Sequence, residues 1–176
     1  MWVTRFDRAN GQRFALEDAT QVIGILPSQK YSVPAEEVVT ALATKCAAVP
    51  LAQRNLYLQF LIAWLTGNGD LHAKNVSILK QEGRWDVAPI HDLLCTALYR
   101  VFTLALPLNA KTKNLKRQDW LDFAASIGLP KTVAESSKRQ VLTVVARINL
   151  SQLPVSGSTL TGAERELRHR RYQIEA

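Results

Sequence analysis

The feature that most constrains the fold is an apolar segment that ends abruptly in a glycine-rich turn. Residues 51–66 carry apolar side chains nearly all round a helix of 3.6 residues per turn, rather than along one stripe. Such a helix usually forms the buried centre of a domain, so we expect Phe60 and Trp64 in the core. Residues 67–69, Gly-Asn-Gly, follow at once and tolerate the positive φ angles that end a helix. The sequence therefore predicts a central helix with a sharp loop at its carboxyl end.

The chain has 176 residues, a length that suits one domain with a single core. Its longest apolar stretch, residues 56–65, contains Gln59 and is shorter than the ~20 residues of a membrane-spanning helix. Residues 1–8 have no apolar signal region, so we expect no signal peptide. Cys46 and Cys95 form no Cys-x-x-Cys motif. We expect a cytoplasmic domain without disulfides and without a membrane partner.

Basic side chains exceed acidic ones, because 22 Lys and Arg against 15 Asp and Glu give a net charge of +7. They form two clusters, which comprise Lys111, Lys113, Lys116 and Arg117 and then Arg165, Arg168, Arg170 and Arg171. The second cluster alternates with Glu164 and Glu166 at spacings that allow ion pairs along a solvated helix. Neither cluster has the interleaved aromatic residues of a single-strand-binding surface. We interpret both as solvated basic surface, with polyanion binding as the alternative.

Periodicity and breakers predict a mainly α fold with a small β-hairpin. Pro34, followed by acidic residues, is typical of a helix amino terminus. The predicted helices span residues 32–48, 51–66, 120–127 and 132–150, with a last one from about 159. The predicted strands span residues 76–79 and 85–90, with a turn at 81–83. We see no internal repeat and expect a single domain over residues 1–176.

The segment with the clearest chemistry follows the central helix and reads Gly-Asn-Gly-Asp-Leu-His-Ala-Lys-Asn over residues 67–75. Asp70 precedes Asn75 by five positions, which is the Asp-to-Asn spacing of the protein kinase catalytic loop. In that loop the Asp accepts the proton of the substrate hydroxyl and the Asn holds Mg²⁺. Asp92 follows the predicted hairpin and offers a second metal-binding carboxylate. Asp70 and Asn75 alone also fit a plain helix-ending turn, and Asp92 favours the catalytic interpretation.

Several separated motifs resemble the HipA-type serine/threonine kinase toxins of bacterial toxin–antitoxin modules. Residues 67–77 resemble the catalytic loop of that family, residues 3–8 its hinge and residues 88–94 its metal-binding segment. Residues 16–18 and 27–31 also fit the family pattern, and all motifs occur in the family order. The resemblance implies a protein-kinase-like C-terminal lobe.

The resemblance also implies a role for each matching residue. Asp70 would be the catalytic base, while Asn75 and Asp92 would hold Mg²⁺. The implied ATP contacts are Thr4, Arg5 and Phe6 for adenine, Asp7 near the ribose, and His72, Lys74, Asn75, His91 and Asp92 around the phosphates and metal. Thr4 stands where the family usually has an acidic residue.

The residue types alone leave simpler interpretations open for several of these positions. His72 would otherwise be a loop histidine with a local hydrogen bond, and Lys74 an exposed loop lysine. His91 and Cys95 lie four positions apart, but no further ligand pair supports a zinc site. Cys95 is expected to be a small buried residue.

A kinase cleft also needs a glycine-rich phosphate-covering loop and a strand lysine, and neither precedes the hinge motif in this sequence. We therefore expect ATP- and Mg²⁺-dependent phosphorylation of serine or threonine on a protein substrate only after an N-terminal lobe or antitoxin chain completes the cleft. DNA would be reached only indirectly, through an antitoxin. The alternative is a non-catalytic remnant or binding module that retains the fold.

Overall fold

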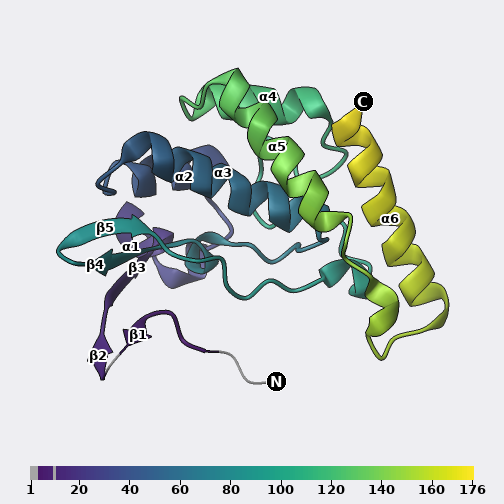
Figure 1. Cartoon of the computed structure of the whole chain (residues 1–176), viewed down its shortest axis with the longest axis horizontal. Helices are drawn as coiled ribbons and strands as arrows, with labels where there is room; N and C mark the ends of the chain where they lie inside the picture. The colour runs from purple at the N-terminus through teal and green to yellow at the C-terminus, as the bar shows by residue number, and fades with distance from the viewer. Residues whose placement is uncertain (1–3, 10) are drawn as a thin grey trace.

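The computed structural model describes residues 4–9 and 11–176 as a mainly helical domain with two small antiparallel sheets (Figure 1). The helices are α1 (Ala19–Ile23), α2 (Ala35–Ala43), α3 (Val49–Leu65), α4 (Arg117–Ser126), α5 (Lys131–Val145) and α6 (Gly157–Glu175). The strands are β1 (Arg8–Ala9), β2 (Gln12–Arg13), β3 (Ala15–Asp18), β4 (Ser77–Gln81) and β5 (Arg84–Val87). Short 3₁₀ turns lie at Pro27–Gln29, Ala73–Asn75, Thr96–Tyr99 and Leu150–Gln152. Val3, the first residue of the expected hinge, lies outside the described residues.

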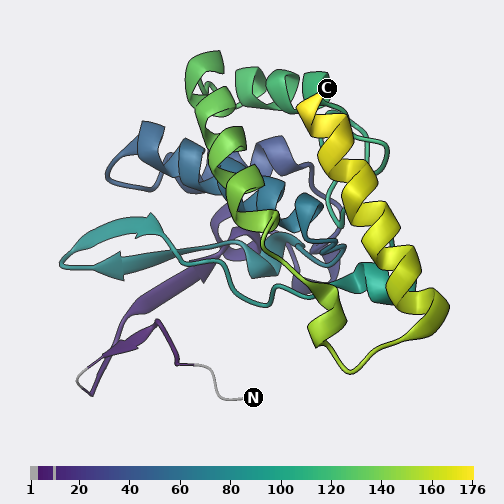
Figure 2. The same ribbon diagram turned by 45° about the vertical axis from the view of Figure 1, so that its right-hand side comes forward.

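Helix α3 is the centre of the domain, as its apolar pattern predicts. Phe60 and Trp64 are only 1% and 2% exposed, which confirms their place in the core. Helices α2, α5 and α6 all contact α3, and α5 crosses it in both ribbon views (Figures 1 and 2). Because neighbours cover α3 on several sides, its apolar residues need no single stripe.

The carboxyl end of α3 is closed by a Schellman motif. Gly67 has φ +74° and donates its N–H to the Trp64 carbonyl at 3.2 Å. The N–H of Asn68 reaches the Ala63 carbonyl at 2.8 Å. This is the pair of reversed hydrogen bonds that satisfies the last carbonyls of a helix. The predicted helix-ending turn at residues 67–69 is confirmed.

The main sheet has three strands, so the predicted hairpin is correct but incomplete. Strands β4 and β5 pair antiparallel through a two-residue turn at Glu82 and Gly83, whose φ angles of 49° and 79° are typical of a type I′ hairpin. Strand β3 pairs with the other edge of β4, with Asp18 opposite Ser77. The four residues of β3 lie far from β4 in the sequence. A segment this short carries too little apolar alternation to predict a strand.

Two predicted helices are shorter in the structure. Helix α2 begins after Pro34, which has an extended backbone, rather than at residue 32, because the residue before a proline disfavours helical geometry. It ends at Ala43. Beyond it, the Cys46 N–H bonds to the carbonyl three residues back, at Ala43, in place of the four-residue spacing of an α-helix. Helix α5 likewise ends at Val145 instead of residue 150.

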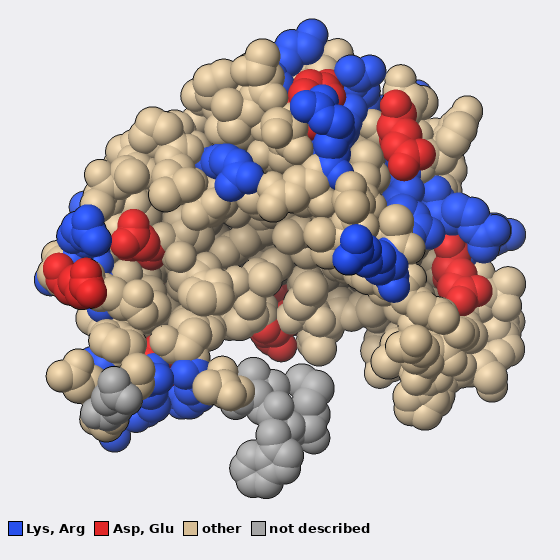
Figure 3. All heavy atoms as spheres, in the orientation of Figure 1, with Lys and Arg blue, Asp and Glu red and all other residues tan. Residues whose placement is uncertain are grey.

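The basic surface is solvated in part, as expected, with one exception. Lys and Arg side chains gather over the α4, α5 and α6 side of the face in Figure 3. Lys111 Nζ pairs with Asp119 at 2.6 Å, and Arg117 pairs with Glu135 at 2.9 Å. Arg170, however, is 1% exposed, so its expected place on a solvated helix face is wrong. Within residues 4–9 and 11–176, no helix combines the length and apolar character needed to cross a membrane.

The aromatic cluster between α3 and α4 yields a stability prediction. Phe123 is fully buried, with its ring centroid 5.9 Å from those of Tyr57 and Phe60. Phe123→Ala should lower the free energy of unfolding by about 3–5 kcal/mol, because it leaves a cavity in the core. Urea denaturation measures the change. The control Tyr172→Ala, at a side chain that is 66% exposed, should change it by under ~0.5 kcal/mol. Equal losses in both variants would contradict the assigned core.

Candidate active site

The predicted catalytic loop runs from the end of α3 to the start of β4. Asp70 N–H donates to Asn68 Oδ1 at 2.8 Å, which fixes the backbone as it leaves the helix-ending turn. Further along, His72 N–H bonds to the Asp70 carbonyl and Asn75 N–H to the His72 carbonyl, both at 2.9 Å. Consecutive short-range bonds of this kind, which include the 3₁₀ turn Ala73–Asn75, hold the loop in one shape.

Asn75 brings together the three residues that the sequence assigns to phosphoryl transfer. Its Nδ2 donates to the Asp70 backbone carbonyl at 3.1 Å and to Asp92 Oδ2 at 3.2 Å. Asn75 is 8% exposed, so the surrounding chain restricts its side chain. Asp92 is exposed and has φ +53°, a left-handed conformation that is uncommon for a residue other than glycine. Residues 17 positions apart thus meet beyond the ends of β4 and β5 that lie opposite the hairpin turn.

The donor set suits a hard divalent cation. Because Asn75 uses Nδ2 for Asp70 and Asp92, its amide oxygen Oδ1 takes no part in either bond. Asp92 adds an exposed carboxylate beside it. An amide oxygen with a carboxylate is the oxygen chemistry that Mg²⁺ prefers. Across the part of the chain that the structure describes, no group of three His, Cys, Asp or Glu side chains lies close enough to hold a metal.

Lys30 and Tyr31 contact the loop, and sequence reasoning gave neither of them a role. Tyr31 donates its hydroxyl to Asp70 Oδ1 at 2.8 Å. The Lys30 carbonyl accepts the N–H of Ala73 at 3.0 Å, so this dipeptide is attached to the loop through its backbone as well. The hydrogen bond to Asp70, followed by burial, raises the pKa of the Tyr31 hydroxyl. The family-like pattern of residues 27–31 was the only signal in the sequence.

His72 is buried beneath this dipeptide. It is 6% exposed, its ring lies edge-on to Tyr31 at 5.2 Å, and its Nε2 lies 2.8 Å from Lys30 Nζ. Burial first, and then the neighbouring Lys30 charge, lowers the pKa of the His72 imidazole. In a neutral ring Nε2 can accept a hydrogen bond from the Lys30 ammonium group. This is the local hydrogen bond that the simpler interpretation of His72 expects, and contact with phosphates stays a prediction.

The remaining predicted residues lie near the metal segment or on the surface. The Phe6 ring centroid lies 5.4 Å from that of His91, which brings the hinge close to Asp92 in the chain. Arg5 Nε donates to Asp7 Oδ1 at 2.7 Å, and this bond lowers the pKa of the Asp7 carboxyl. Thr4 and Lys74 are exposed. The contact between Phe6 and His91 therefore brings the predicted hinge next to the predicted metal-binding segment.

A family model described as the HipA-like C-terminal domain matches residues 1–148, which include the segments predicted as hinge, catalytic loop and metal-binding segment. The chain belongs to this family. Residues 149–176, including all of α6, lie beyond the matched part.

Curated relatives of this HipA-like domain are kinases by name. The candidate kinase Y4dM of Sinorhizobium fredii is 35% identical over 148 residues, which cover 80% of this chain and 35% of the relative. The serine/threonine-protein kinase toxin HipA of Shewanella oneidensis is 27% identical over 169 residues, covering 82% of this chain and 38% of the relative. The chain thus spans little more than a third of the length of these relatives.

Solved structures confirm the kinase-like fold. HipA of Shewanella oneidensis, in a complex with HipB and its operator DNA, matches 97% of this chain and 47% of its own, with a TM-score of 0.74 and 22% identity. The proinflammatory kinase CtkA of Helicobacter pylori matches 92% of this chain and 66% of its own, with a TM-score of 0.50 and 15% identity. The predicted protein-kinase-like lobe is therefore confirmed as a fold.

The buried imidazole of the HipA-like domain predicts a pH-dependent stability. In the unfolded chain His72 titrates near ~6.5, whereas its pKa is lowered in the folded state. As pH falls through that value, the unfolded chain gains a proton that the folded chain does not, so stability decreases. His72→Gln should flatten this part of the curve in urea titrations between pH 7 and 5. His169→Gln, at an exposed site on α6, is the control, and an unchanged curve for His72→Gln would contradict the assignment.

Proposed function

We propose that this domain is the C-terminal lobe of a HipA-like kinase that phosphorylates serine or threonine on a protein substrate, within a toxin–antitoxin module. The observation that carries the proposal is the double hydrogen bond of Asn75 to Asp70 and Asp92. It unites a base candidate and two metal-ligand candidates from separate segments. The family membership and the kinase names of the relatives support the same reaction class.

In the proposed reaction Asp70 accepts the proton of the acceptor hydroxyl as that oxygen attacks the γ-phosphorus of ATP, whose bond to the β,γ-bridging oxygen breaks to release ADP. The Tyr31 hydroxyl at 2.8 Å from Asp70 Oδ1 supports this role, since it demonstrates that a hydroxyl can reach the carboxylate. Asn75 keeps the Asp70 backbone fixed through its bond to the carbonyl. Positioning of this kind supplies most of the catalysis in phosphoryl transfer.

Asn75 and Asp92 would hold Mg²⁺, and the ion would supply neutralisation of phosphate charge when bound. The hinge residues Thr4, Arg5, Phe6 and Asp7 would receive the adenosine part of ATP. His91 beside Phe6, together with Lys74 and His72, would line the phosphate side. An opposite lobe with a phosphate-covering loop and a lysine would complete this site.

The proposed partners follow from the two lobes that a kinase cleft needs and from the structural neighbour. An N-terminal lobe or an antitoxin chain would contact this domain, and DNA would be reached only through an antitoxin. HipA of Shewanella oneidensis, which was crystallised with HipB and operator DNA, supports this arrangement. A cytoplasmic location is part of the same proposal.

The activity test removes the proposed base without changing its shape. Residues 1–176 alone should transfer phosphate from radiolabelled ATP to a protein at or near background, and added N-terminal lobe should restore transfer. Asp70→Asn should then lower the restored rate at least ~100-fold, since general-base catalysis contributes about 10²–10⁴-fold. The control Asp86→Asn, at an exposed position on β5, should leave the rate unchanged. Strong transfer by the Asp70→Asn variant would refute the proposal, and failure of every N-terminal lobe to restore transfer would favour a binding module.

The metal test is independent of activity. Mn²⁺ should selectively broaden NMR signals of residues around Asn75 and Asp92, since oxygen ligands favour Mg²⁺ and Mn²⁺ over Zn²⁺. Asp92→Asn should weaken this broadening by at least about tenfold in Mn²⁺ concentration, because even changes to the outer-shell partners of a metal site cost about 10–100-fold in affinity. Asp86→Asn again serves as the matched control. Broadening that is insensitive to Asp92 would argue against the assigned ligands.

A further inference from the structure

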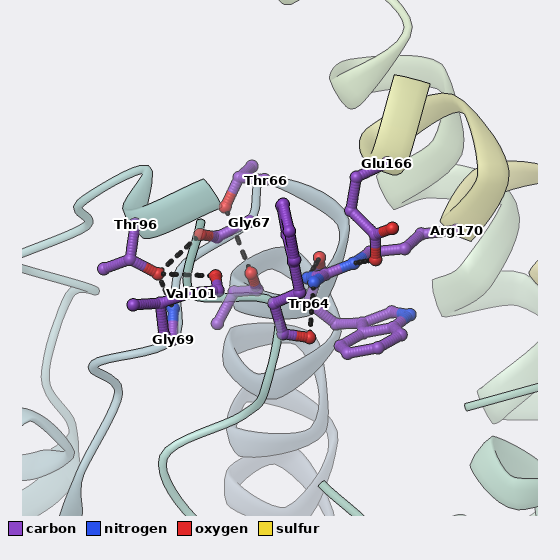
Figure 4. A network of polar contacts seen from close by, with 10 residues as sticks. Trp64, Thr66, Gly67, Gly69, Thr96, Val101, Glu166 and Arg170 are labelled. Carbon is purple, nitrogen blue, oxygen red and sulfur yellow. Dashed lines mark hydrogen bonds and ion pairs between the residues drawn. The ribbon is translucent and has the colours of Figure 1, made fainter. Parts of the chain in front are cut away.

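Arg170 of α6 is a buried charge outside the part of the chain that the family model matches. It is the one buried charged residue among the exposed and partly exposed charges of α6, and its guanidinium faces the end of α3 (Figure 4). Burying an arginine costs several kcal/mol unless its donors are paired. The contacts that satisfy this side chain therefore indicate what α6 is attached to.

Arg170 joins three separate segments. Nη1 donates to the Trp64 carbonyl at 2.8 Å, Nη2 donates to the Phe102 carbonyl at 2.7 Å, and Nε donates to Glu166 at 2.8 Å. The guanidinium also lies 3.8 Å from the centroid of the Trp64 ring, within the range of a cation–π contact. Trp64 belongs to the last turn of α3, directly before the loop that carries Asp70. Arg170 thus links that turn to the segment that follows Asp92.

Thr96 completes the link between this segment and the loop. Its Oγ1 accepts the N–H of Gly69 at 2.7 Å and lies 3.0 Å from the Gly67 carbonyl and 3.3 Å from the Val101 carbonyl (Figure 4). One hydroxyl therefore contacts both glycines that precede Asp70. The N–H of Ala97 also bonds to the Gly67 carbonyl, at 3.1 Å.

The two glycines are needed for this close approach. A Cβ at Gly69 would lie 2.6 Å from the Thr103 carbonyl and 2.8 Å from Thr96 Oγ1. A Cβ at Gly67 would lie 2.9 Å from Ala97 Cβ and 3.0 Å from Leu167 of α6. Residues 95–103 and α6 thus pack closely against the start of the predicted catalytic loop.

We propose that α6 is a positioning element for the candidate active site: Arg170 fixes the last turn of α3 against residues 96–102, and Thr96 transmits that position to Gly69 and Asp70. Arg170 and Thr96 are positioning residues, since neither lies among the reacting groups. The inference rests on the proposed function only in naming Asp70 as the base. The physical coupling between α6 and the loop stands on the contacts themselves.

Amide hydrogen exchange on the full chain tests the coupling without any activity. Arg170→Met should speed exchange at Gly69 and Ala97 about tenfold or more, the effect of losing roughly one net hydrogen bond. The amide of Ala88, which bonds to the Ser77 carbonyl across β4, should keep its rate. Arg168→Met, at an exposed arginine of the same helix, is the matched control. Uniformly faster exchange in the Arg170 variant would overturn the proposal, because it would make Arg170 a contributor to global stability alone.

A second pair of variants keeps the test decisive if Arg170→Met does not fold. Thr96→Val removes the hydroxyl at nearly constant volume and should speed exchange at Gly69 about tenfold. Thr96→Ser retains the hydroxyl and should restore the wild-type rate. Equal exchange at Gly69 in the Val and Ser variants would overturn the proposal.

The completed enzyme supplies the readout for positioning. With an N-terminal lobe added, Thr96→Val should lower kcat at least about threefold while the KM for ATP stays constant, and Thr96→Ser should recover it. A change in KM alone would overturn the positioning role. If wild-type transfer is absent, the proposed function fails, while the exchange data still decide whether α6 holds the loop.

Discussion

The structure depends on how the carboxyl end of one buried apolar helix is satisfied. Helix α3 lies at the centre of the core, so its last carbonyl groups cannot turn to water. Local N–H groups of Gly67 and Asn68 satisfy two of them, and the Arg170 guanidinium adds a second donor to the Trp64 carbonyl. The same contacts fix the direction in which the chain leaves the helix. The hydrogen bonds that cap α3 therefore also fix the position of Asp70, which follows directly after the capping residues.

The loop after α3 and the β4–β5 hairpin together bring the residues of the candidate site into contact. Strand β4 begins two residues after Asn75, and strand β5 returns the chain antiparallel to it. Asp92, 17 positions after Asn75, therefore lies close enough to accept its hydrogen bond. Asn75 is polar and nearly buried, and both of its observed bonds go to groups of the site. A side chain that is restrained in this way can fix the orientation of the groups around it.

The sequence predicted the parts of the molecule that local chemistry determines. The apolar pattern identified α3, and the Gly-Asn-Gly turn identified where that helix ends. The Asp-to-Asn spacing identified Asp70 and Asn75, which the structure joins by a hydrogen bond. Contacts made across long separations could not be read in this way. Strand β3 needs β4 to exist, Tyr31 meets Asp70 from 39 positions away, and Arg170 resembles its exposed neighbours in a charged helix. Nothing in a run of arginines indicates which of them will be covered.

The bond between Arg170 and Trp64 joins positions that lie 106 residues apart in the chain. During synthesis the ribosome adds residues in order, and contacts of such separation form last. The Gly-Asn-Gly turn can form its own hydrogen bonds to α3 while translation continues. The Arg170 bond to the Trp64 carbonyl can form only after α6 has been synthesised. A nascent chain therefore carries the loop in a looser form until almost all of the domain has emerged.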